Sequence, residues 1–271
     1  MPELPEVETV RKVLDKEIVG LTITDIKIKY DNIIDYDIDD FKKKIINKKI
    51  TGTDRLGKYL IFNLNDGNII SHLRMEGKYF YLPKDTFDNK HVHVVYYFDN
   101  GYSLIYQDVR KFGRMTYREN NELFSTKPLS EVGIDPILNK KIDIENIYDK
   151  IISRSVAIKT TLLDQSIIAG LGNIYVDEVL FLSKIDPTRP SNTIKKEEVE
   201  RIVNSSISIL SKAIEFKGTT IRSYTSSLGV EGQFQNFLNV HTKKECPHCK
   251  NILNRVKING RTTYFCKSCQ R

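Results

Sequence analysis

The 271-residue sequence has no tryptophan, only four cysteines, and no apolar run near the roughly 18 residues that a membrane-spanning helix needs. Its first six residues include two acids and no apolar segment, so we expect no secretory signal peptide. With 40% hydrophobic and 28% charged residues, the chain has enough apolar material for a core, which excludes wholesale disorder. The length favours two domains with a small appendage.

Acidic residues are almost absent from residues 240–271. This segment contains eight Lys and Arg residues and a single acid, Glu245, so it carries the whole net charge of +7. Residues 1–239 balance at 34 charges of each sign. A compact basic segment on a neutral body indicates a polyanionic partner such as a nucleic acid. A solubilising charged tail would have the same composition, so charge alone leaves both readings open.

All four cysteines lie in that basic segment, as Cys246-x-x-Cys249 and Cys266-x-x-Cys269. Two such pairs at this separation are typical of a zinc ribbon, in which four thiolates surround one metal ion. Two disulfides or a redox motif are the alternatives, which the expected absence of a signal peptide and of a thioredoxin-like βαβ pattern disfavours. The sequence therefore predicts one structural Zn²⁺, with His248 left on the surface.

The rest of the chain changes character near residue 129. A helix is predicted over residues 3–19 from apolar side chains three or four positions apart, and Gly20 is a natural stop. Alternating strand patterns with two hairpin signals, at residues 65–67 and 99–101, predict a sandwich or flattened barrel over 21–118. Helical patterns follow, and we expect helices at residues 142–152, 158–168, 173–182 and 195–216.

The N-terminus is the first candidate for catalysis. Initiator Met1 is normally removed when a small residue such as Pro2 follows it, which gives Pro2 a free secondary amine. An α-amino group titrates near 7.7–8.0, against about 10.4 for lysine, so more of it is a neutral nucleophile at neutral pH. Attack on a sugar C1′ gives a cationic iminium, and Glu3 could protonate a departing oxygen. Pro and Glu are also ordinary choices at a helix start, so both interpretations stay open.

Two glycine-containing turns are further candidates. Lys58 follows Gly57 at the start of a predicted strand, although a lone lysine in such a place is usually solvated. Residues 170–173, Gly-Leu-Gly-Asn, precede a predicted helix, where glycines let a phosphate approach the free N–H groups. Each signal is weak by itself.

An exposed-looking aromatic lies among cations at residues 107–113. Here Arg110 and Lys111 precede Phe112, a composition typical of a nucleic-acid contact or an intercalating wedge. Met75 lies at the end of the first predicted hairpin. Packing in the core is the alternative for both Phe112 and Met75.

Five motifs together resemble the formamidopyrimidine-DNA glycosylase (Fpg) family. They follow one another in the family's order from residue 2 to residue 270, so the resemblance covers the whole chain. The motifs are Pro2-Glu-Leu-Pro-Glu-Val, Gly57-Lys-Tyr-Leu, Asp108-Val-Arg-Lys-Phe-Gly, Gly172-Asn-Ile-Tyr and the closing segment 260–270.

The resemblance implies an α+β multidomain fold. Residues 1–128 would form a catalytic domain with an N-terminal helix on a β-sandwich. Residues 129–239 would form a helix-two-turn-helix domain, whose loop 218–232 covers the flipped lesion. Residues 240–271 would form a zinc-ribbon β-hairpin, with one structural Zn²⁺ bound by Cys246, Cys249, Cys266 and Cys269.

The resemblance also implies roles for single residues. Pro2 would be the Schiff-base nucleophile and Glu3 the acid at the sugar ring oxygen. Lys58 would assist β-elimination, while Arg261 would bind phosphate and serve δ-elimination. Void filling after base extrusion would fall to Met75, Arg110 and Phe112. Contacts with the DNA backbone would fall to His91, Arg154, Lys159 and Asn173, although the family often has lysine at position 154.

The resemblance thus implies a bifunctional DNA glycosylase and abasic-site lyase that excises oxidised purines from duplex DNA. Leu4 favours the Fpg branch over the endonuclease VIII-like branch, which takes oxidised pyrimidines and typically has glycine there. That branch remains an alternative, as does a non-enzymatic zinc-ribbon DNA-binding protein. We further expect a monomer without membrane association, in the bacterial cytoplasm and at the nucleoid.

Overall fold

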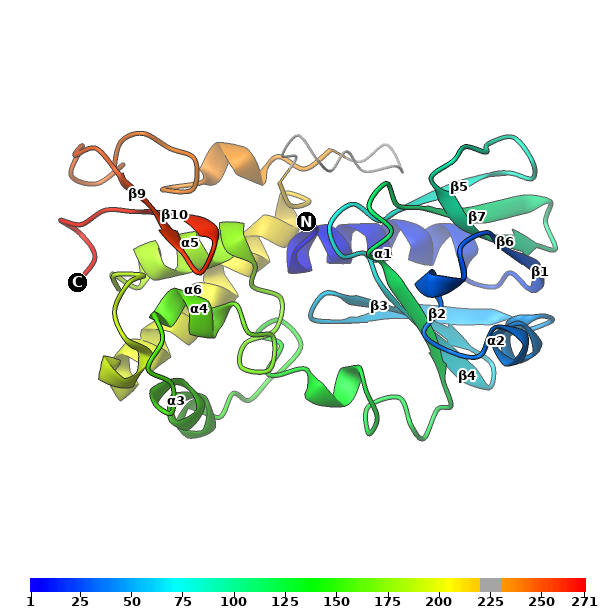
Figure 1. Cartoon of the computed structure of the whole chain (residues 1–271), viewed down its shortest axis with the longest axis horizontal. Coiled ribbons are helices and arrows are strands. Elements are labelled where there is room, and N and C mark those ends of the chain that lie inside the picture. Colours follow the sequence, from blue (N-terminus) through cyan, green and yellow to red (C-terminus); the bar gives the residue numbers. More distant parts are fainter. Residues whose placement is uncertain (220–230) are drawn as a thin grey trace. The chain divides into compact units, whose positions relative to one another are not determined.

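The computed structural model of the chain describes residues 1–219 and 231–271 (Figure 1). The loop expected to cover the lesion, 218–232, lies mostly outside the described residues. The chain forms two compact units. The first is built mainly on residues 6–130, and the second on residues 3–5, 131–218 and 233–271.

The first unit contains two four-stranded antiparallel sheets. Their strands share one core, which includes Phe62 of one sheet and Tyr106 of the other, so the predicted sandwich is confirmed. Both predicted hairpins are present. In order across the first sheet the strands are β1 (Ile23–Ile28), β6 (Val92–Phe98), β7 (Tyr102–Gln107) and β5 (Lys78–Pro83). In the second sheet they are β2 (Ile50–Leu56), β3 (Tyr59–Leu64), β4 (Gly67–His72) and β8 (Arg114–Arg118).

Helix α1 (Leu4–Ile18) packs on this core through the predicted apolar stripe, which begins with Val7 and ends with Ile18. Polar contacts with β2 fix its position. Thr53 of β2 accepts from the Arg11 side chain at 3.1 Å through its carbonyl oxygen. Its N–H and hydroxyl both donate to Asp15, at 3.1 and 2.8 Å. A second helix of this unit, α2 (Ile38–Ile45), was not predicted.

The second unit is helical, with a C-terminal hairpin (Figure 1). Helix α5 is buried on nearly all sides, which explains its almost continuous apolar sequence. The elements are α3 (Ile144–Ile152), α4 (Ile158–Leu162), α5 (Asn173–Leu182), α6 (Lys196–Glu215), β9 (Asn254–Ile258) and β10 (Arg261–Phe265). Single turns of 3₁₀ helix occur at Asp31–Ile33, Leu129–Glu131, Ser191–Thr193 and Phe234–Phe237.

The C-terminal hairpin has a small apolar cluster of its own, to which helix α5 contributes Phe181. Val240, Leu253 and two of the cysteines complete that cluster. The hairpin therefore folds against α5 as part of the second unit. Among the described residues, no helix combines the length and the apolar character that crossing a membrane requires.

Candidate functional site

Glu3 is buried at the start of helix α5. Its carboxylate accepts hydrogen bonds from the N–H groups of Gly172 at 2.7 Å, Ile174 at 3.0 Å and Tyr175 at 3.3 Å. A Cβ atom at Gly172 would lie 2.3 Å from the Glu3 Cδ, so only glycine leaves room for the carboxylate. Since Gly172 supplies no side-chain cap, Glu3 caps α5 from 169 residues away and fixes residues 3–5 in this unit.

Pro2 is buried, directly before Glu3, and Met1 is exposed. In the first unit Glu6 accepts from both the N–H and the hydroxyl of Thr219, at 2.7 and 3.2 Å. Glu6 thus fixes the chain at the residue just before the segment 220–230. The sequence indicated acids in the first helical turn but gave no sign of this long-range contact.

Lys58 lies in the tight turn between β2 and β3 and is only 5% exposed. Gly57 supports the turn with a φ of 56°, a conformation that favours glycine. Arg55 stabilises it, since its Nη1 donates to the Gly57 carbonyl at 3.0 Å and its Nε to Glu8 at 3.1 Å. The turn therefore holds a buried lysine on a rigid support.

Asp108 organises the loop that carries the predicted wedge. Its fully buried carboxylate accepts from the N–H groups of Arg110, Phe112 and Gly113, at 3.0, 2.9 and 2.8 Å. The loop presents Phe112 with 47% of its surface exposed, and the Arg110 guanidinium lies 4.7 Å from the centre of that ring. This exposure is at odds with packing of Phe112 in the core of the described structure.

The loop of Met75 lies beside the Asp108 loop, and the two meet at Tyr106. A Cβ at Gly77 would lie 2.3 Å from the Tyr106 hydroxyl, and one at Gly113 only 1.7 Å from it. That hydroxyl also donates to Asp108 at 3.3 Å. Because both loops have glycine at this point, they pack against the same buried tyrosine. The half-buried Met75 and the exposed Phe112 therefore lie on loops with a common support.

Two of the expected backbone contacts lie on loops. The carbonyl of the half-buried His91 accepts from the N–H of Asp108 at 3.0 Å, so His91 adjoins the wedge loop. In the second unit the Arg154 guanidinium forms an ion pair with Asp164 at 2.7 Å, with about a third of each side chain exposed. Burial by itself raises the pKa of Asp164. The hydrogen bonds from the Ser166 N–H and from Arg154 outweigh that effect, so the pKa lies below its ordinary value.

Lys159, predicted as a phosphate contact, is fully buried in the structure. Its ammonium donates to Asp177 at 2.7 Å and to the Thr262 carbonyl at 3.3 Å. Burial lowers the pKa of the ammonium, and the Asp177 carboxylate partly opposes that fall. The amide of Asn173 donates to the same Thr262 carbonyl at 3.0 Å. Lys159 and Asn173 therefore meet next to Arg261, which is exposed.

Two acids of α5 that were not predicted from the sequence hold the C-terminal segment in place. Asp177 contacts Lys159 and His241, and Glu178 accepts from the N–H groups of residues 239, 240 and 241. Both acids are buried. Two adjacent acids inside an otherwise apolar helix were the available signal, because buried carboxylates need partners.

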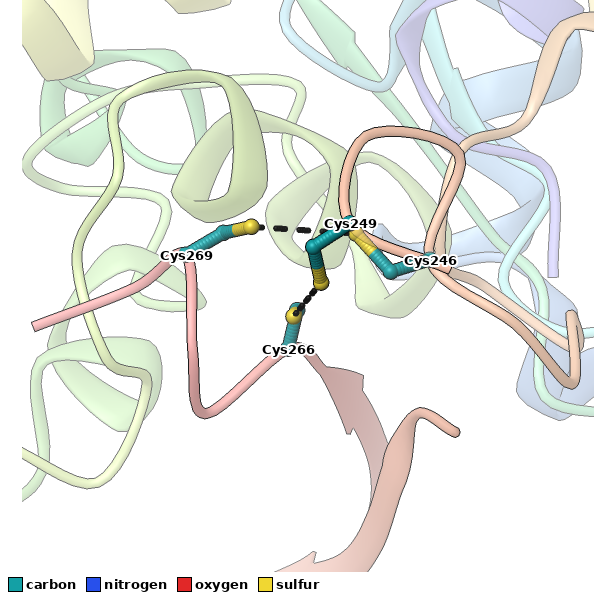
Figure 2. A group of neighbouring side chains, drawn as sticks. All are labelled: Cys246, Cys249, Cys266 and Cys269. Atoms are coloured by element: carbon teal, nitrogen blue, oxygen red, sulfur yellow. Dashed lines mark hydrogen bonds between the residues drawn. The ribbon is translucent and has the colours of Figure 1, made fainter. Parts of the chain in front are cut away.

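The four cysteine sulfurs form one compact group (Figure 2). All Sγ atoms lie within 4.8 Å of one another, with Cys246 to Cys269 at 3.8 Å and Cys249 to Cys266 at 3.5 Å. A tetrahedron with Zn–S bonds of about 2.3 Å has edges of about 3.8 Å. Disulfides would need about 2.05 Å. The geometry thus fits one zinc ion.

The electrostatics of the thiols also call for a cation. Burial raises the pKa of Cys269 to about 12, and the neighbouring thiols add to the rise. In Cys246 burial is outweighed by the backbone N–H groups of Cys249 and His248, which lower its pKa to about 7. Zinc binding requires all four as thiolates, and a bound cation favours that form. His248 is exposed and is not part of the thiol group.

Comparison with known proteins gives matches along the whole chain. Residues 1–115 match the formamidopyrimidine-DNA glycosylase N-terminal domain, and residues 132–225 match the formamidopyrimidine-DNA glycosylase H2TH domain. Residues 243–271 match the zinc finger found in FPG and IleRS. The last match, together with the thiol geometry, confirms the prediction of one structural zinc ion per chain.

Full-length relatives agree with these matches. The formamidopyrimidine-DNA glycosylase of Streptococcus pneumoniae R6 is 42% identical, over 100% of this chain and 99% of its own length. That of Mycoplasmopsis pulmonis is 43% identical, over 100% and 98%.

Solved structures of Lactococcus lactis Fpg are similar as well. A mutant in complex with Fapy-dG containing DNA has a TM-score of 0.93 at 40% identity and covers 100% of both chains. A complex with abasic-site containing DNA has a TM-score of 0.91 at 39% identity and covers 99% of both. With three family models in order, full-length relatives and a common fold, this chain belongs to the formamidopyrimidine-DNA glycosylase family.

Proposed function

We propose that this chain is a bifunctional DNA glycosylase and abasic-site lyase that removes oxidised purines, 8-oxoguanine and formamidopyrimidines, from duplex DNA. The main observation in support of this proposal is the position of the Glu3 carboxylate. Three N–H groups at the start of α5 hold this carboxylate, and its chain neighbour is the proline whose amine is the nucleophile. The base must first leave the stack, because its glycosidic bond is out of reach in the duplex.

Chemistry begins once Met1 has been removed. The nitrogen of Pro2 attacks C1′ of the damaged nucleotide, and the bond from C1′ to the base breaks with its electron pair going to the base. After the attack the Pro2 nitrogen passes its proton to the Glu3 carboxylate. Glu3 then gives that proton to the ring oxygen as the C1′–O4′ bond opens, and the lone pair of the nitrogen forms the iminium between Pro2 and C1′. The iminium accepts electrons during the two eliminations, and loss of the 3′ and then the 5′ phosphate leaves a one-nucleotide gap.

Two cations serve the eliminations. Lys58, buried in its tight turn, assists the β-elimination, and the exposed Arg261 binds a phosphate and serves the δ-elimination. Met75 on one loop, with Arg110 and Phe112 on the Asp108 loop, fills the space left by the flipped base. Their contacts offset part of the free-energy cost of unstacking. His91, Arg154 and Asn173 contact the DNA backbone. A repair enzyme of chromosomal DNA works at the bacterial nucleoid, where we place this chain.

Two comparisons test the proposal. Borohydride reduces the iminium, so an abasic-site duplex should become covalently attached to the chain; a purely DNA-binding protein gives no adduct. Excision is then measured on matched duplexes containing 8-oxoguanine or thymine glycol. We expect faster excision of 8-oxoguanine. Preference for thymine glycol would assign the chain the endonuclease VIII-like activity instead.

A further inference from the structure

Strand β10 is joined to helices α4 and α5 by hydrogen bonds at two of its residues, Thr262 and Tyr264. Lys159 of α4 and Asn173 of α5 both donate to the carbonyl of Thr262, at 3.3 and 3.0 Å. Two residues further along β10, the N–H of Tyr264 donates to Asp177 at 3.2 Å. Helix α5 and β10 lie side by side (Figure 1). These contacts fix the backbone of β10 directly after Arg261.

Asp177 is the common member of these contacts. Its side chain is 0% exposed, and both of its oxygens are in use. Oδ1 accepts from the Lys159 ammonium at 2.7 Å, while Oδ2 bonds to His241 Nδ1 at 2.8 Å and accepts from the Tyr264 N–H. A buried carboxylate with partners on a helix, on the linker into the ribbon and on β10 orients all three.

Arg261 differs from its surroundings. It is exposed, and among residues 1–219 and 231–271 no hydrogen bond or ion pair involves its guanidinium. Its backbone is fixed by the next residue, and the hairpin turn before it contains Asn259 and Gly260 in left-handed conformations. An arginine with a fixed backbone and an uncommitted side chain is suited to binding an anion from outside the protein.

We infer that Asp177 is a positioning residue for Arg261: through Lys159, Thr262 and Tyr264 it sets the backbone from which Arg261 contacts a DNA phosphate. The same helix carries Glu3 on its first N–H groups, so α5 holds Glu3 and the arginine in one frame within the second unit. The inference rests on the proposed function, because it takes the anion to be a phosphate of the DNA.

The test is the salt dependence of binding by the zinc-loaded full chain to a duplex with a tetrahydrofuran abasic analogue. Each phosphate contact contributes about 0.9 to the slope of log K against log salt concentration. We expect Arg261→Ala and Asp177→Asn each to reduce the slope by about 0.9, and the double variant to reduce it no further. Bound zinc should stay at one per chain.

Two more variants make the result decisive. Asp177→Asn leaves a buried lysine without its counter-charge, so Lys159→Met/Asp177→Leu, which replaces the pair by apolar side chains, is measured as well. It should fold, bind zinc and show the reduced slope. Glu178→Gln is the matched control. This equally buried acid contacts residues 239–241, and within residues 1–219 and 231–271 it makes no hydrogen bond to β10, so the variant should keep the wild-type slope.

A wild-type slope in the folded Asp177 variants would overturn the inference. So would a loss that adds to that of Arg261→Ala, or an equal loss in Glu178→Gln. Borohydride trapping by the wild-type chain is measured in parallel. Absence of trapping would contradict the proposed function, but the salt dependence of binding could still be compared among the variants. Failure of the proposed function and failure of the inference about Asp177 therefore give different results.

Discussion

At the scale of single residues, Glu3 holds the start of α5 and, in the proposed function, also acts as the acid at the sugar. Glu3→Gln keeps the size of the side chain but places an amide donor against N–H donors of α5. We expect a loss of about 1–3 kcal/mol in stability from the unsatisfied donors. Base excision should fall about 10²–10⁴-fold, and cleavage of a pre-formed abasic site should fall less, because its aldehyde is already open.

Parallel rates on 8-oxoguanine and abasic duplexes check this expectation. Glu17→Gln is the matched control, since Glu17 is an exposed acid on the same helix and its change should leave both rates unaltered. Equal losses on the two substrates in Glu3→Gln would reduce Glu3 to a helix cap.

His72 gives the fold a dependence on pH. Burial, with the nearby Arg74 and Lys58 charges, lowers its pKa to about 3, and its Nδ1 accepts from the Arg74 N–H at 2.9 Å. The folded pKa lies below the unfolded value of about 6.5, so the unfolded state takes up the proton first and stability falls as pH drops below that value. At pH 5 this single group should cost about 2 kcal/mol relative to pH 8.

Urea unfolding of wild type and His72→Asn at both pH values measures that contribution. Asparagine can accept the same hydrogen bond but does not titrate, so its stability should change about 2 kcal/mol less between the two conditions. An identical change in both proteins would show that His72 does not contribute.

At the scale of elements, a change in the loop after Asp108 distinguishes a DNA-binding role of Phe112 from a packing role. Phe112→Ala removes a half-exposed ring, so the melting temperature should hardly change. Affinity for a damaged duplex should fall about tenfold or more, because wedging the duplex open involves a few kcal/mol. Affinity for a single-stranded abasic oligonucleotide should fall less.

Phe124→Ala is the control for the wedge, since Phe124 is an exposed aromatic of the same unit, 62% exposed. It should alter neither affinity. Equal losses on the two substrates in Phe112→Ala, with a lower melting temperature, would return Phe112 to a packing role.

Elements were predictable where the pattern is long and its ends are marked. Helix α1 was predicted over residues 3–19 and runs from Leu4 to Ile18 because its apolar stripe is regular and Gly20 follows. Helix α4 was predicted to reach residue 168 but ends at Leu162. There the Asp164 side chain accepts from the N–H and hydroxyl of Ser166, which replaces helical bonds, while the apolar residues beyond it remain buried.

At the scale of the whole molecule, the motifs predicted candidate functional residues but not the contacts that support them. The zinc site could be predicted because the ligands are close in sequence and their number is fixed by the metal. The support of Glu3 by Gly172 and of β10 by Asp177 could not, since these partners lie 169 and 87 residues apart. Contacts at such separations leave no local periodicity.

Zinc is expected to stabilise the ribbon and thereby the position of Arg261. Cys249→Ser should lose both the metal and tight DNA binding, because a segment of about 30 residues has little core and draws its folding energy from the metal. Metal content and affinity for abasic duplex check this. His248→Ala, an exposed neighbour outside the thiol group, should keep both. Stoichiometric zinc with unchanged affinity in Cys249→Ser would contradict the expectation.

The most direct test of the account is to identify the residue that carries the sugar after borohydride trapping. We predict that mass spectrometry of the digested adduct places it on the N-terminal peptide, at the nitrogen of Pro2. Retaining Met1 should abolish the adduct, because the proline nitrogen is then a tertiary amide; Pro2→Gly should keep some trapping and Lys58→Ala should still trap. Full trapping with Met1 retained, no adduct in Lys58→Ala and the sugar on the peptide of Lys58 would contradict the account.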